Sequence, residues 1–298
     1  MLIKLNLVRI LKLIQKSQAM FKNYFLLIRP FQWVKNLIIF FPLIFAKKIF
    51  ELDAFVLSSK AFIIFILASS IVYIFNDICD LEQDKKHPIK KNRPLANNSL
   101  KKKDAYLLIM LLGLLLLMLL KFNISILGII IAFFILNIFY SLYFKNIIII
   151  DLIIVSLSYV IRVLAGSIII NVVLSEWLLI CVFSSSLFLI SFKRLAEMKI
   201  SGFKSRPILK KYNNEILLKI IDVSAICSII FYSLYTVFVN PNLIYTVPLI
   251  FVGFFRYYYL YYTAKIFEES PVKIIFSDKP ILALLIFWLV IVLVSIRI

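Results

Sequence analysis

The chain has 298 residues, of which 63% are hydrophobic and only five are glycine, and its formal net charge is +19. This composition is too apolar for an ordinary water-soluble globular protein. The positive charge does not indicate a nucleic-acid-binding protein, because the cations lie at the ends of apolar segments and not in a polar module of their own. We therefore expect an integral membrane protein whose partner is the lipid bilayer, with no nucleic acid.

The first twenty residues differ from the rest of the chain. Lys4, Arg9, Lys12 and Lys16 interrupt the apolar residues, as in an amphipathic helix that lies at the lipid headgroups. A retained signal peptide is the alternative, but no small-residue cleavage site closes the segment. We expect an interfacial segment at 1–20 and one membrane domain at 21–298.

The membrane domain contains a series of long apolar segments. Each is long enough to cross about 30 Å of hydrocarbon as a helix that satisfies its own backbone hydrogen bonds. The segments show no strand-like alternation and exceed the roughly 10 residues of a membrane barrel strand. We predict an all-α polytopic bundle of about nine transmembrane helices. The predicted spans lie near residues 31–50, 55–78, 104–121, 124–144, 147–170, 173–192, 217–239, 243–263 and 279–297.

Two connecting segments carry much of the positive charge, at 85–103 after the second span and at 193–211 after the sixth. Because four spans separate them, both lie on the same side of the membrane, and their lysines and arginines favour the cytoplasm. Lys47 and Lys48, in the first outer loop, depart from this pattern. We expect a multi-pass protein of the inner (plasma) membrane with its active-site loops in the cytoplasm.

The second span ends in an acidic motif. Asp77, Asp80 and Asp84 stand at i, i+3 and i+7, which places three carboxylates on one helix face at about 100° per residue. Such a cluster needs a cation, and its oxygens together with the amide of Asn76 suit Mg²⁺, which commonly joins a few carboxylates to substrate phosphates. The alternative is a solvated helix end neutralised by the lysines that follow.

The basic loop after this motif holds two candidate phosphate-binding residues. His87 is the only histidine of the chain, and Arg93 precedes a proline in the same loop. A guanidinium can hold a phosphate through two parallel hydrogen bonds. The alternatives are a surface loop position for His87 and a membrane-anchoring role for Arg93.

Polar and ionisable side chains also interrupt other spans, where such groups usually face a cavity or a partner. Lys35 and Asn36 fall in the first span. Asp151 and Arg162 fall in the fifth span on one helix face, but about 16 Å apart along the axis, so they cannot pair with each other. Each therefore needs a partner on another helix or a polar cavity.

The sixth span ends in "SFKRLAE", which brings Lys193, Arg194 and Glu197 together. Lys193 and Glu197 stand at i and i+4, so they can form a surface ion pair. The alternative is that the cations of this stretch contact a substrate phosphate.

These motifs resemble those of a known family. "NDICDLEQD" from Asn76 fits the NDxxDxxxD signature of the UbiA superfamily of intramembrane prenyltransferases. The stretches "RPFQWVKNLIIFFPLIFA" from Arg29, "DLIIVSLSYVIRVLAG" from Asp151 and "KRLAE" from Lys193 are similar to the branch that contains decaprenyl-phosphate phosphoribosyltransferase. The resemblance spans roughly residues 22–297, and the joint occurrence of the stretches makes it specific.

The resemblance implies a bundle of nine helices around a central cavity, capped by cytoplasmic loops that carry the two polar motifs. It implies transfer of 5-phosphoribose from phosphoribosyl diphosphate to a polyprenyl phosphate, with release of diphosphate and with Mg²⁺ as cofactor. We predict no oligomeric state from the sequence.

With the charged positions described above, these motifs give the predicted site. The predicted metal ligands are Asn76, Asp77, Asp80 and Asp84. The predicted catalytic residues are Asp77, Asp80, Lys193 and Arg194. The predicted substrate-binding residues are Lys35, Asn36, His87, Arg93, Asp151, Arg162, Lys193, Arg194 and Glu197.

Two other functions are compatible with the membrane segments. A conventional UbiA-type prenyltransferase moves a polyprenyl chain from its diphosphate to an aromatic or other small acceptor. That class has a second aspartate-rich motif, where this chain has the cationic "KRLAE". A carrier or channel would use Asp77, Arg162 and Lys193 to line an ion path, but the sequence shows no internal repeat of the broken-helix kind.

Overall fold

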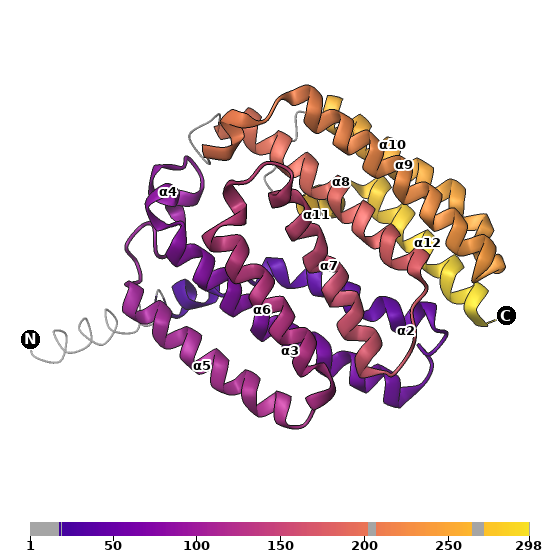
Figure 1. Cartoon of the computed structure of the whole chain (residues 1–298), viewed down its shortest axis with the longest axis horizontal. Helices are drawn as coiled ribbons and strands as arrows, with labels where there is room; N and C mark the ends of the chain where they lie inside the picture. The colour runs from indigo at the N-terminus through magenta and orange to yellow at the C-terminus, as the bar shows by residue number, and fades with distance from the viewer. Residues whose placement is uncertain (1–17, 19, 202–206, 264–270, 298) are drawn as a thin grey trace, which may run out of the picture.

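The computed structural model describes residues 18, 20–201, 207–263 and 271–297, and every regular element in these ranges is helical (Figure 1). The predicted all-α class is therefore confirmed. The predicted interfacial segment at 1–20 falls almost entirely outside the described residues.

Nine segments of the described chain are long and apolar enough to cross a membrane, as predicted. Eight of them contain one long helix each, namely α3 (Leu52–Cys79), α5 (Lys102–Lys121), α6 (Leu127–Leu142), α7 (Ile150–Ile169), α8 (Glu176–Ser201), α9 (Asn214–Phe238), α10 (Val247–Thr263) and α12 (Lys279–Arg297). The short helices are α2 (Phe41–Phe45), α4 (Leu81–Lys86) and α11 (Pro271–Ser277). The chain is a multi-pass membrane protein.

The first span is built differently from the others. It covers Met20–Phe45, whereas the sequence predicted 31–50. Arg29 has a left-handed backbone (φ 55°) before Pro30, where a 3₁₀ helix, η1 (Pro30–Phe40), begins and leads into α2. A residue before proline avoids the right-handed helical region, which explains the interruption. The bend lies close to the acidic motif, because Arg29 contacts Asp77 there.

Helix α7 occupies the middle of the bundle. It packs against α3 and α6 on one side and against α8 on another, and the first span lies against it through η1 and α2. Figure 1 shows α3, α5 and α6 in one part of the molecule and α9, α10 and α12 in the other, with α7 between them. Polar side chains on α7 are therefore within reach of helices from both parts.

Gly166 on α7 permits an unusually close approach of the first span. A Cβ atom at this position would lie 2.1 Å from the backbone carbonyl oxygen of Ile39. Only a residue without a side chain allows η1 to lie this near, since a backbone oxygen cannot move aside at low cost. The contact sets the spacing of Arg162, one turn earlier on α7, and Asn36 on η1.

The acidic motif does not lie on one continuous helix. Helix α3 ends at Cys79 and α4 begins at Leu81, with Asp80 in a turn between them. The prediction of a single helix face through Asp77, Asp80 and Asp84 is therefore wrong at Asp80. The sixth span also differs from its prediction, because α8 continues beyond residue 192 and contains the whole of "KRLAE".

Candidate active site

Two acids of the motif converge on arginines. Asp77 is 3% exposed, and its Oδ2 accepts a hydrogen bond of 3.2 Å from Nε of Arg29. Its Oδ1 accepts bonds from Nη2 of Arg29 and, at 3.0 Å, from Nη1 of Arg93. The same Nη1 donates to Oδ2 of Asp84, so Arg93 bridges the two carboxylates. We name Arg29, Asp77, Asp84 and Arg93 the α3–α4 cluster.

The remaining two residues of the motif face other elements. Asp80 pairs with Lys145, in the turn after α6, at 2.5 Å. The side-chain oxygen of Asn76 accepts a hydrogen bond from Ser141, at the end of α6. The motif is therefore divided between two cationic positions, Arg93 and Lys145.

Burial raises the pKa of Asp84, and the neighbouring carboxylate of Asp77 adds to this effect. The Arg93 guanidinium acts in the opposite direction and favours the ionised form. The net direction for the Asp84 pKa is upward, and the Arg93 cation limits this rise.

The α3–α4 cluster suits a divalent cation shared with a phosphate. Within the described residues, no three His, Cys, Asp or Glu side chains converge into a metal site. Oxygens of Asp77 and Asp84 nevertheless meet at one cationic nitrogen. Mg²⁺ is commonly held by one or two carboxylates together with substrate phosphates, so this donor set fits Mg²⁺ that arrives with a phosphorylated substrate.

His87 shapes the loop that carries Arg93. Its side chain is buried, which excludes the surface position considered from the sequence. Its Nδ1 accepts hydrogen bonds from the backbone nitrogens of Ile89 at 3.1 Å and Lys90 at 3.3 Å. His87 thus orders the turn after α4 and holds the loop over the acidic motif.

A second ionic group joins α7 to α8. Arg194 is 2% exposed and donates from Nε to Asp151 at 2.7 Å, from Nη1 to Glu197 at 2.9 Å and from Nη2 to the Tyr140 hydroxyl at 3.0 Å. Tyr212 donates to the other oxygen of Asp151 at 2.5 Å. Burial raises the pKa of Tyr212, so this hydroxyl keeps its proton. We name Tyr140, Asp151, Arg194, Glu197 and Tyr212 the α7–α8 cluster.

Glu197 brings the two predicted motifs together. Its Oε1 lies 3.9 Å from Nζ of Lys193, the i, i+4 pair expected from the sequence, and 4.0 Å from Nζ of Lys90. Lys90 belongs to the loop after the acidic motif, so the two polar motifs meet at one end of the bundle. Asp151 has its partner on another helix, Arg194, which is one of the two alternatives considered from the sequence.

Arg162 lies deeper in the bundle and is 3% exposed. Its Nε donates to the side-chain oxygen of Asn36 at 2.8 Å, and its Nη1 donates to the backbone and hydroxyl oxygens of Ser158, both at 2.6 Å. The guanidinium also lies over the rings of Phe133 and Tyr159, at 4.9 and 5.6 Å. All of these partners are neutral.

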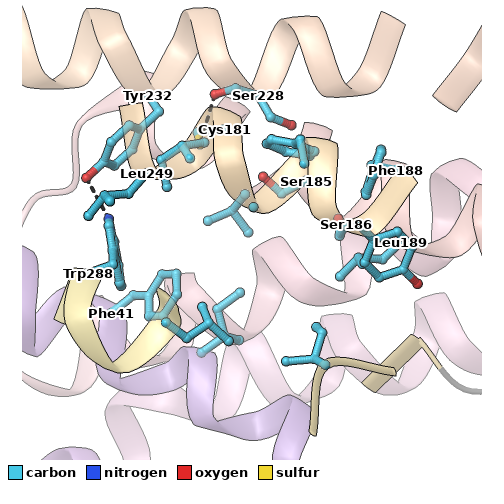
Figure 2. A pocket seen from close by; sticks show the side chains of 18 of the residues that line it. Phe41, Cys181, Ser185, Ser186, Phe188, Leu189, Ser228, Tyr232, Leu249 and Trp288 are labelled. Atoms are coloured by element: carbon cyan, nitrogen blue, oxygen red, sulfur yellow. Dashed lines mark hydrogen bonds between the residues drawn. The ribbon is translucent and has the colours of Figure 1, made fainter. Parts of the chain in front are cut away.

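An apolar cavity of about 370 Å³ lies between the first span and helices α7 to α12 (Figure 2). Phe41 and Trp288 project into it in Figure 2, as do Phe188 and Leu189 of α8. Two of its serine hydroxyls donate to backbone carbonyls, Ser186 to the oxygen of Phe183 and Ser228 to that of Ser224. Such a wall offers burial to hydrocarbon and few hydrogen bonds to a polar ligand.

A sequence model of the UbiA prenyltransferase family matches residues 37–277, which is most of the chain. The chain belongs to the UbiA prenyltransferase family.

Curated relatives of this UbiA chain carry a more specific name. The decaprenyl-phosphate phosphoribosyltransferase of Mycolicibacterium smegmatis is 33% identical over 216 residues, covering 70% of this chain and 68% of that protein. The protein of the same name from Mycobacterium tuberculosis (strain CDC 1551 / Oshkosh) is 32% identical over 218 residues, covering 70% of this chain and 72% of that protein.

The fold is also that of solved UbiA structures. A UbiA homologue from Archaeoglobus fulgidus, bound to GPP and Mg²⁺, superimposes with a TM-score of 0.68, covering 93% of this chain and all of that chain. At a sequence identity of 18%, this similarity shows a shared fold and nothing more specific.

Four residues of the candidate site were not predicted from the sequence. Arg29 stands in the first family-like stretch, but nothing in the local pattern links it to Asp77, 48 positions later. Lys145 resembles any other cation at a span end, and Tyr140 and Tyr212 resemble interfacial tyrosines. The signal for Arg29 was its position before a proline at the start of a span.

Proposed function

We propose that the chain transfers 5-phosphoribose from phosphoribosyl diphosphate to a polyprenyl phosphate and releases diphosphate, with Mg²⁺ as cofactor. The observation that carries the proposal is the composition of the end of the bundle where the two motifs meet. The carboxylates of Asp77 and Asp84 stand there among cations, and the α8 motif contributes Lys193 and Arg194 where a second aspartate cluster would otherwise stand. Relatives named for this activity, about one third identical, support the same choice.

The charge balance of the two substrates explains this composition. The donor carries a diphosphate and a 5-phosphate, and the acceptor carries another phosphate. Several phosphates near one metal site need additional cations, and arginine and lysine form strong charge-assisted hydrogen bonds with them. A prenyl diphosphate with a neutral aromatic acceptor would bring only one charged group.

The reaction exchanges one bond for another at the anomeric carbon. An oxygen of the acceptor phosphate forms a bond to this carbon, while the bond from the carbon to the diphosphate oxygen breaks and its electron pair leaves with diphosphate. The acceptor oxygen is already an anion, so no general base is required. Catalysis then rests on positioning the substrates and on stabilising the charge of the leaving group.

The residues of the α3–α4 cluster have distinct proposed roles. Asp77 and Asp84 would hold Mg²⁺, which when bound neutralises charge on the diphosphate. Arg29 and Arg93 lie beside them and would contact phosphate oxygens of the donor. Asp80, beside Lys145, would lie at the edge of the same metal and phosphate site. Asn76 would hold this end of α3 in place through its contact with α6.

We assign a different role to Arg194 than to its neighbour. All three nitrogens of the Arg194 guanidinium already donate to protein oxygens, so Arg194 would position α7 against α8. The Lys193 side chain is 29% exposed and would be the phosphate contact of this motif. The apolar cavity would receive the polyprenyl tail.

An assay with alternative donors tests the proposal. Purified protein would be incubated with labelled phosphoribosyl diphosphate, a polyprenyl phosphate and Mg²⁺, and in parallel with a prenyl diphosphate and an aromatic acceptor. We expect labelled lipid and free diphosphate in the first reaction alone. Consumption of prenyl diphosphate without use of the ribosyl donor would instead establish a conventional prenyltransferase.

The proposed orientation places the active-site loops in the cytoplasm, with the protein in the plasma membrane. Its support is the basic loops at 85–103 and 193–211, which the contact of Lys90 with Glu197 brings to one end of the bundle. Ser99 and Asn242 are both exposed, and the proposed topology places them on opposite sides of the membrane. In a background with the native cysteines changed to serine, Ser99→Cys should resist an impermeant thiol reagent in intact cells and Asn242→Cys should react. The reverse pattern would contradict this orientation, and both should react after permeabilisation.

A further inference from the structure

We infer that Lys35 and Arg162 form the binding site for the phosphate of the polyprenyl acceptor, deeper in the membrane than the metal motif. The inference rests on the proposed function. It assigns the acceptor phosphate and the donor diphosphate to separate groups of cations.

Charge compensation separates Lys35 and Arg162 from Arg29 and Arg194. The other intramembrane arginines considered above have acidic partners, since Arg29 pairs with Asp77 and Arg194 with Asp151. Within the described part of the chain, no ion pair includes Lys35 or Arg162. A charge buried in a membrane protein usually has an ionic partner or serves a ligand. An anionic ligand would supply the missing charge.

The Arg162 guanidinium is held in a fixed orientation. Its hydrogen bonds to Asn36 and Ser158 use Nε and Nη1 and hold the group in place between two aromatic rings. Among the described residues, Nη2 makes no hydrogen bond. The arginine is thus oriented by neutral contacts and keeps a donor for a ligand, as preorganised binding groups do.

Contacts along α3 connect these cations to the metal motif. Arg162 donates to Asn36, which directly follows Lys35, and Asn36 donates at 3.2 Å to Ser69 of α3, one turn before Tyr73. Arg29 is 5.6 Å from the Tyr73 ring and contacts Asp77, which follows Tyr73 by four residues, or about 6 Å along the helix. A phosphate at Lys35 and Arg162 would therefore lie next to a donor held at Asp77.

The position of the apolar cavity favours the lipid phosphate over the 5-phosphate of the donor. Tyr159, whose ring lies 5.6 Å from the Arg162 guanidinium, lines the cavity, as does Ile38, three residues after Lys35. A hydrocarbon tail in the cavity would carry its phosphate to the cations. Two positive charges also match a phosphate monoester, which carries about −1.5 to −2 at neutral pH.

Separate titration of the two substrates tests the assignment. In Lys35→Gln and Arg162→Gln we expect the KM for polyprenyl phosphate to rise about 10-fold or more, the loss typical of one charge-assisted contact, with the donor KM changed less than about 2-fold. Lys60→Gln removes an exposed lysine elsewhere and controls for net charge. Ser158→Ala removes a hydroxyl contact of Arg162 but keeps its charge, and should leave the lipid KM within about 3-fold.

A binding measurement makes the result independent of turnover. Wild type and variants would be titrated with a short-chain polyprenyl phosphate and with the polyprenol of the same length, without donor or Mg²⁺. We expect the variants to lose affinity about 10-fold for the phosphate and to bind the alcohol as wild type does. Lys35 is only partly buried, so Lys35→Gln remains informative if Arg162→Gln does not fold.

The possible failures are distinguishable. A wild type that forms no phosphoribosyl lipid would overturn the proposed function, while its preference for polyprenyl phosphate over polyprenol would still test the cation site. Variants that raise only the donor KM would assign these cations to the 5-phosphate and overturn the inference. If wild type binds the polyprenyl phosphate and the polyprenol equally well, Arg162 serves only to hold helices together. That result would also overturn the inference.

Discussion

The α3–α4 and α7–α8 clusters are both built from arginine and acidic side chains, yet they differ in access. In the α3–α4 cluster the arginine side chains of Arg29 and Arg93 are 22% and 27% exposed. In the α7–α8 cluster the side chain of Arg194 is 2% exposed and those of Asp151 and Glu197 are fully buried. The first cluster is open to a ligand and the second is closed.

The difference shows how similar charges can serve different purposes. A partly exposed arginine can exchange a carboxylate for a phosphate, because water and ligand both reach it. An arginine whose nitrogens are all hydrogen-bonded in the interior holds helices together, and removal of one partner leaves an uncompensated charge. Variants of the two clusters should therefore affect different measurements.

The largest effect is expected for Arg194→Gln. It leaves Asp151 and Glu197 buried without their cation, which should lower the free energy of unfolding by about 3–5 kcal/mol. Thermal unfolding in detergent would measure the loss, and Arg194→Lys, which keeps the charge, should lose less. Arg256→Gln, which breaks a more exposed pair with Asp278, is the matched control and should unfold much as wild type does. Wild-type stability in Arg194→Gln combined with weak donor binding would return Arg194 to the role of a phosphate ligand.

The next effect concerns Asp77→Asn. The change keeps the shape of the side chain but removes a charge from the open cluster, so turnover should fall about 100-fold or more, comparable with the loss of an important electrostatic stabiliser. Steady-state rates over a Mg²⁺ titration would measure it. Asp53→Asn, an exposed acid in the first turn of the same helix, should have wild-type rates. Full turnover of Asp77→Asn at limiting Mg²⁺ would argue against a metal at this cluster.

The smallest effect is expected for Tyr212→Phe, which measures how much one uncharged residue contributes to the stability of the α7–α8 cluster. The variant removes the hydrogen bond to Asp151 but no charge, and should cost about 1.5 kcal/mol of stability. Tyr245→Phe changes a tyrosine that is 80% exposed and serves as the control. Unfolding of the two variants at the same temperature as wild type would show that Tyr212 contributes little to the closed cluster.

Much of the architecture could be predicted from the sequence. Apolar segments of about 20 residues can cross a membrane only as helices, because each backbone group must find its hydrogen bond within the segment. The acidic motif and "KRLAE" were predicted as candidate site residues from the i, i+3, i+7 spacing of the aspartates and from the family resemblance. The bounds of the first span were predicted wrongly, since Arg29, Pro30 and the 3₁₀ helix depend on local backbone geometry.

The all-α class, the approximate spans and the charged residues of the two polar motifs all follow from the amino-acid sequence. Tertiary structure decided how those charges are paired. Arg29 meets Asp77 across 48 positions, Arg194 meets Asp151 across 43, and Arg162 meets Asn36 across 126. The periodicity of a helix shows which of its residues share a face, but not which helix lies opposite or at what depth. That depends on packing, such as the contact of η1 with Gly166, and it separates the open cluster from the closed one.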